Sequence, residues 1–141
     1  MLPASCMALI AFQNEYQLTV EPAQNRIFYK VFREMSEAEG LPHYLADWAA
    51  ALAAVQPGFT ILTDVSSFVR ANPNLAPLYV EAQRLIMARG VGMVAEIHRP
   101  DSPSYDSSRG ISSRSGMPVR TFVDSWEADR FLDDWRTQSA G

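Results

Sequence analysis

The sequence predicts one α/β domain, built on a single mixed and mostly parallel five-stranded sheet with helices packed on it. Strand-like and helix-like patterns alternate along the 141 residues in the order β-β-α-β-α-β-α-β-α. A short turn joins the first two strand patterns, which indicates an antiparallel hairpin. No internal repeat and no linker rich in Gly and Ser divides the chain. We therefore expect one domain over residues 15–141, preceded by an N-terminal extension over residues 1–14 that is ordered at most in part.

The first half of the chain predicts a hairpin, a helix and a buried strand. Residues 15–21 alternate apolar and polar side chains, residues 26–33 are rich in β-branched and aromatic side chains, and residues 22–25 between them have turn composition. Residues 41–55 repeat apolar side chains at helical spacing until Pro57-Gly58 ends the pattern. Residues 59–65 are almost continuously apolar, as in a strand covered on both faces, and Asp64 interrupts them.

The second half predicts helices alternating with strands. Apolar side chains between residues 75 and 86 share one helical face, with Asn72 or Asn74 available as a cap and Gly90 at the end. Residues 91–97 and 118–123 have strand patterns, and Asp124 or Ser125 begins a last helix. Residues 99–117 contain seven serines and three arginines and fit either a weak helix or an ordered loop.

Composition and charge exclude several classes of function. The chain is 48% hydrophobic and 20% charged, as in a folded globular domain, and its net charge of −4 argues against nucleic acid as a partner. With Cys6 as its one cysteine, the chain has no means of forming an intramolecular disulfide or a cysteine metal cluster. No apolar run approaches the ~20 residues that span a bilayer, and the N-terminus lacks the basic start of a signal peptide. We expect a cytoplasmic protein with no cofactor, no bound metal and no membrane span.

Two stretches resemble the STAS family, the anti-sigma-factor-antagonist-like domains. They are FTILTDVSSF over residues 59–68 and VRTFVDSWEADRFLDDW over residues 119–135, which look like a family strand with its following loop and like the closing strand and helix. Together with the element order, the resemblance covers nearly the whole chain from residue 15. It implies a STAS-like fold in which Asp64 matches the family's aspartate at a strand end. The family's phosphorylated serine or threonine would fall within residues 71–74, where neither residue type stands, so no phosphorylation switch is expected.

Polar residues predicted at the carboxyl ends of the strands form the candidate binding surface, because ligands of open α/β sheets bind there. The arginines among serines offer donors for phosphate or carboxylate groups. In the alternative interpretation, Asp64 and Asp124 accept backbone N–H bonds as caps and His98 is a surface residue. The candidate residues are Asp64, Ser66, Ser67, Asn72, Asn74, His98, Arg99, Arg109 and Arg114.

Two functions of different classes remain open. The first is a non-enzymatic STAS-like regulatory or protein-interaction module that binds another protein or forms a homodimer, with Phe68 and Tyr105 as candidate exposed aromatics. The second is a binder of a small anionic or lipid-like ligand, or a weak enzyme, at the carboxyl ends of the strands. No catalytic residue is assigned, because the sequence contains no nucleophile elbow and no glycine-rich phosphate loop.

Overall fold

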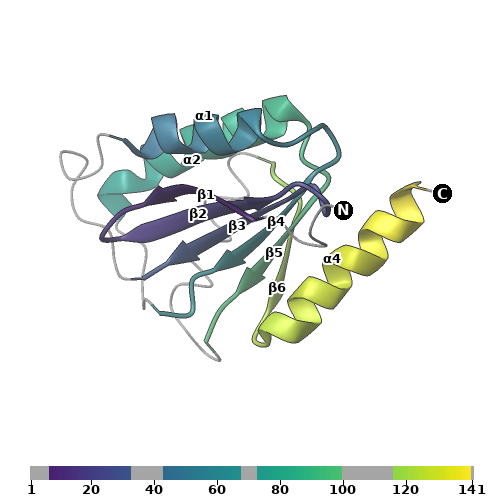
Figure 1. The fold of residues 1–141 in the computed structure, drawn as a ribbon. Coiled ribbons are helices and arrows are strands. Elements are labelled where there is room, and N and C mark those ends of the chain that lie inside the picture. The colour runs from purple at the N-terminus through teal and green to yellow at the C-terminus, as the bar shows by residue number, and fades with distance from the viewer. Residues whose placement is uncertain (1–6, 33–42, 68–72, 100–115, 141) are drawn as a thin grey trace.

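The computed structural model describes residues 7–32, 43–67, 73–99 and 116–140, and these form one six-stranded mixed sheet (Figure 1). The strands lie in sequence order across the sheet. The hairpin β2–β3 is antiparallel, β1 is antiparallel to β2, and β3 to β6 run parallel to one another. The strands are β1 (Ala8–Phe12), β2 (Tyr16–Glu21), β3 (Arg26–Val31), β4 (Thr60–Asp64), β5 (Met93–Ile97) and β6 (Val119–Phe122).

The expected mixed α/β architecture is confirmed, but the expected count of five strands is wrong. The sixth strand, β1, lies within residues 1–14, which the sequence indicated only as an N-terminal extension. Two physical features hide it in the sequence. Alanine at positions 8 and 11 has low strand propensity. A register shift between Leu9 and Ala11 also breaks the two-residue alternation that identifies a half-buried strand.

Helices cover both faces of the sheet, but unequally (Figure 1). On one face lie α1 (Tyr44–Ala53) and α2 (Ala76–Arg89), which pack against each other; the short 3₁₀ turn η2 (Pro73–Leu75) leads into α2. On the opposite face lies α4 (Ser125–Ala140), which packs over β4, β5 and β6. The helix that the sequence allowed between residues 99 and 117 falls outside the described residues. Among the described helices, none packs over β1 and β2 on the α4 face.

The core has one cluster on each side of the sheet. The larger one lies beneath α1 and α2 and contains alternate residues of the strands, such as Leu18, Ile27 and Ile61, together with Trp48. The smaller one lies beneath α4 and is centred on Ala95, Ile97, Ala128 and Leu132. The alternating residues of 15–21 therefore point in turn toward α1 and α2 and toward the opposite face of the sheet.

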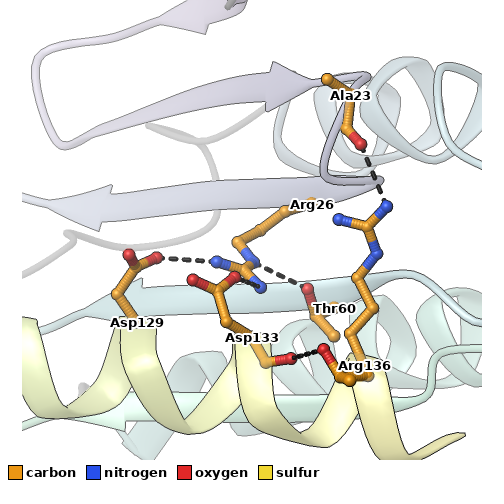
Figure 2. A network of polar contacts seen from close by, with 7 residues as sticks. Ala23, Arg26, Thr60, Asp129, Asp133 and Arg136 are labelled. Atoms are coloured by element: carbon orange, nitrogen blue, oxygen red, sulfur yellow. Dashed lines mark hydrogen bonds and ion pairs between the residues drawn. The ribbon is translucent and has the colours of Figure 1, made fainter.

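A buried arginine fastens α4 to the start of β3 (Figure 2). The Arg26 side chain is fully buried, and its guanidinium donates to Asp129 Oδ1 at 2.7 Å and to Asp133 Oδ1 at 2.9 Å. Its Nε donates to Thr60 Oγ1 at 2.8 Å. Asp129 and Asp133 are four residues apart and so share one face of the helix. The network thereby joins residues more than one hundred positions apart in the chain.

Candidate functional site

Asp64, Ser66 and Arg99 meet in the loop that follows β4. Asp64 Oδ1 accepts hydrogen bonds from the Ser66 backbone N–H at 3.0 Å and from Ser66 Oγ at 2.5 Å. The exposed Arg99 donates through Nε to the Ser66 carbonyl at 2.6 Å. The carboxylate therefore closes an Asx-type turn, which is the capping alternative inferred from the sequence. Three of the nine candidate residues are brought together here, and the contacts observed among them stabilise the loop.

The other exposed candidates do not join this group in the described part of the chain. Ser67 is exposed next to Ser66, and Asn74 is exposed in η2, where Leu75 occupies the helix-start position of α2 without a side-chain cap. Asn72, Arg109 and Arg114 lie outside the described residues, as do Phe68 and Tyr105. Their roles in binding stay predictions.

Asp124 has the capping role inferred for it. Its Oδ1 accepts from the Trp126 N–H at 2.7 Å and from the Glu127 N–H at 3.3 Å, at the start of α4. These bonds satisfy backbone donors that the first turn of a helix leaves without partners. The side chain is thus accounted for by helix capping.

His98 is buried, so the interpretation of it as a surface residue is wrong. Only 3% of the residue is exposed, and its Nε2 lies 3.0 Å from Glu96 Oε1, which is also buried. In the tautomer that carries its proton on Nε2, the imidazole donates to the carboxylate of Glu96. The two residues are two positions apart and so lie on one side of the sheet, that of α1 and α2. Asp64 alternates with Thr63, which faces α1 and α2, so Asp64 and His98 do not line one common cleft.

Glu96 belongs to a row of polar side chains that crosses the parallel strands. In the strand registers Tyr29 lies beside Thr63, Thr63 beside Glu96, and Glu96 beside Thr121. The Tyr29 hydroxyl lies 3.2 Å from the hydroxyl of Tyr44, the first residue of α1. Burial raises the pKa of both tyrosines above the ordinary value, so both stay protonated and can donate.

Aromatic rings extend this row between the sheet and the two helices. Tyr29 makes an edge contact with Trp48 at a centroid distance of 5.0 Å, and Tyr44 makes one with Tyr79 at 5.9 Å. Trp48 Nε1 is buried and makes no hydrogen bond of normal geometry among the described residues, although its interaction with the Tyr44 hydroxyl lowers the pKa of that group against the larger effect of burial.

The residues that sequence reasoning missed are Glu96, Thr63 and the buried tyrosines. The stretch Glu96-Ile97-His98 contained the signal, because residues i and i+2 of a strand share a face and the intervening strand residues are apolar. The predicted polar edge was sought in residues beyond the strand ends. The structure instead places a buried polar row one to two residues inside those ends.

A second surface feature is exposed apolar area on β1. Leu9 and Phe12 are 60% and 64% exposed although both are large hydrophobic side chains, and Met7 next to the strand is also exposed. Leu9 lies opposite Thr19 and Phe12 opposite Gln17 in the register with β2. These positions alternate with the buried residues of β2, so Leu9 and Phe12 are on the face that α1 does not cover. Exposed apolar groups gathered in this way mark candidate interaction surfaces.

The described residues show no arrangement suited to metal ligation and no helix suited to crossing a membrane. No group of three or more His, Cys, Asp or Glu side chains among them is placed to hold a metal ion. No helix in the same residues is long and apolar enough to cross a membrane.

Comparison with known proteins supports the fold. No protein-family model and no curated protein matches this chain. Among solved structures, the chain is similar to an uncharacterized DUF3478-family protein with a SpoIIAA-like fold from Shewanella loihica PV-4. The TM-score is 0.57 and the identity 13%, over 94% of this chain and 98% of that one. The chain has a SpoIIAA-like fold. The STAS-like architecture expected from residues 59–68 and 119–135 is therefore confirmed, and at this identity the likeness extends to the fold alone.

Proposed function

We propose that this SpoIIAA-like chain is a non-enzymatic, STAS-like regulatory module that acts by binding another protein chain and has no phosphorylation switch. The observation that supports the proposal is the exposure of Leu9 and Phe12 on the part of the sheet that α4 does not cover. Apolar side chains of this size gain free energy when a partner removes them from water, about 25 cal/mol for each Å² buried. The capping roles of Asp64 and Asp124 agree with a module whose polar strand ends maintain the fold.

The test compares partner capture by three forms of the immobilised chain in extracts of the cells that produce it. Phe12→Lys places a charge within the exposed apolar surface, and Val123→Lys is the matched control at an exposed apolar residue just beyond β6. We expect a defined protein to be retained by the natural chain and by Val123→Lys, and to be lost with Phe12→Lys. Equal retention by all three forms, or no specific retention, would contradict the proposal.

A second candidate function is binding of a small ligand, and the buried Glu96–His98 pair favours it. A carboxylate and an imidazole removed from water cost stability unless they are well paired, so such groups inside a domain are candidates for function. The aromatic rings of Tyr29, Tyr44 and Trp48 contact one another on the same side of the sheet, with Thr63 between Tyr29 and Glu96. This combination suits a ligand with an apolar body and a polar or anionic head group, as lipid-like molecules have.

Thermal denaturation in the presence of acyl ligands, lipids, nucleotides and phosphates tests this candidate. A ligand at one hundred times its dissociation constant stabilises the folded state by about 2.7 kcal/mol, which raises the Tm by several degrees. Glu96→Gln should abolish the shift, whereas Glu127→Gln on exposed α4 should keep it. The absence of any shift in the natural chain would exclude these ligand classes.

A further inference from the structure

We propose that the edge of β1 that no other described strand occupies pairs, antiparallel, with β1 of a second copy of this chain, so that two sheets join into one. The inference rests on the proposed function, because it names the partner of the apolar surface around Leu9 and Phe12. It starts from the position of β1 at one end of the sheet, with β2 as its one neighbour among the described strands. A strand there presents backbone N–H and C=O groups that a further strand can pair.

The two edges of the sheet differ in their protection against such pairing. The β6 edge follows Pro118, which lacks a donor, and contains the exposed Arg120, whose guanidinium lies over the Phe131 ring. Prolines, charged side chains and β-bulges are means by which edge strands avoid pairing. The β1 edge has the sequence Ala-Leu-Ile-Ala-Phe, with no proline and no charged side chain, and has the register shift between Leu9 and Ala11. The contrast indicates that β1 is the edge on which pairing is tolerated.

The charge of β1 favours a second copy as the occupant. No Asp, Glu, Lys, Arg or His stands between Met1 and Asn14, so two β1 strands that meet bring no like charges together. A different partner would be expected to find complementary charges that set its orientation, and this segment offers none. Antiparallel pairing of one strand with itself also satisfies a two-fold axis, the commonest symmetry of protein dimers.

The side chains of β1 suit this symmetry. With the axis between Ile10 and Ala11, Leu9 of each copy lies opposite Phe12 of the other. The register shift between Leu9 and Ala11 puts Leu9 and Phe12 on the same side of the sheet, although they are three positions apart. The Phe12 ring already contacts Phe32 at a centroid distance of 5.6 Å. Dimerisation would therefore join two exposed apolar surfaces across the axis and bury both.

Sedimentation velocity on the full chain tests the proposal between about 1 µM and about 500 µM, a range that brackets weak specific complexes. The natural chain should shift with concentration from 15.7 kDa toward twice that mass. Phe12→Lys and Leu9→Lys should each weaken the dimer about tenfold or more, while Val123→Lys, altered at a residue of equal exposure, should behave as the natural chain. Circular dichroism confirms that each variant is folded. A natural chain that stays monomeric throughout, or equal weakening by all three substitutions, would overturn the proposal.

Hydrogen exchange identifies the surface used. Edge pairing should slow exchange of backbone amides in Ala8–Phe12 as the concentration rises, with no such change in β6. A dimer whose β1 amides exchange at the same rate at all concentrations would contradict edge pairing. The outcome is separable from that of the proposed function. If the natural chain is monomeric but captures a different protein that Phe12→Lys does not capture, the dimer is refuted and the proposed function is supported. If the chain dimerises and captures no other protein, the partner of the module is a second copy of itself.

Discussion

Replacing both carboxylates that hold Arg26 should destabilise the fold more than removing the arginine itself. In the variant Asp129→Asn/Asp133→Asn, a fully buried guanidinium loses both counter-charges. Breaking a buried ion pair by removing one side costs about 3–5 kcal/mol. We expect about 3 kcal/mol, at the lower end, because the aspartate side chains are 43% and 50% exposed and solvent screens them.

Arg26→Met provides the comparison, because it removes the charge and keeps most of the apolar stem. The loss is then the hydrogen bond to Thr60 and imperfect packing, about 1–2 kcal/mol. Asp129 and Asp133 are left facing solvent at little cost. The triple variant Arg26→Met/Asp129→Asn/Asp133→Asn should consequently be about 1 kcal/mol more stable than the double aspartate variant, although it carries one more substitution.

Urea denaturation at neutral pH measures these differences as free energies of unfolding from midpoints at constant slope. A control, Asp134→Asn, alters an exposed carboxylate on α4 for which no bond to Arg26 is seen, and should leave stability within about 0.5 kcal/mol of the natural chain. If the double aspartate variant is as stable as Arg26→Met or more so, then the guanidinium reaches water in that variant. In that case the two aspartates do not serve to neutralise a buried charge.

Two further predictions concern packing and pH. Gly92→Ala should destabilise the fold by about 2 kcal/mol in thermal denaturation, because a Cβ there would lie 2.1 Å from the Trp135 ring; Trp135→Leu should restore part of the loss, and an unchanged Tm would mean that α4 shifts freely. Burial, with the hydrogen bond to Asp47, raises the pKa of Tyr16 above its ordinary value of 10.0, so the folded state keeps a proton that the unfolded state releases. Stability should therefore fall as the pH rises past 10.0, and less so in Tyr16→Phe; equal slopes in urea titrations would refute the assignment.

Local patterns predicted most of the fold because they reflect local physics. The hairpin at residues 15–33 and the helix before Pro57-Gly58 are determined by side-chain periodicity and by residues that end helices. Strand β1 was not predicted, because pairing with β2 stabilises it while its own sequence shows no clear strand pattern. A bulge in an alanine-containing strand leaves no period to detect, whereas its cross-strand neighbours define it in the structure.

The candidate site was predictable only where chain neighbours decide the geometry. Asp64 and Asp124 cap backbone groups two or three residues away, and such contacts follow from short-range sequence. The row from Tyr29 through Thr63 to Glu96 depends on the registers of three strands more than thirty residues apart. Periodicity within one segment does not carry that information. It indicates that Glu96 and His98 share a side of their strand, but not that α1 and α2 cover this side.

Two clusters of ionisable side chains in the described part of the chain have different explanations. Arg26 joins β3 to α4, so its burial follows from holding together segments that are distant in the chain. The contact between Glu96 and His98 links two residues of the same stretch, which the β5 backbone already holds at that spacing. That contact by itself does not attach distant segments of the chain. Apolar residues would fill the same positions without the cost of removing a carboxylate and an imidazole from water. The Glu96–His98 pair is therefore the cluster that thermal denaturation of Glu96→Gln with candidate ligands tests for a role in binding.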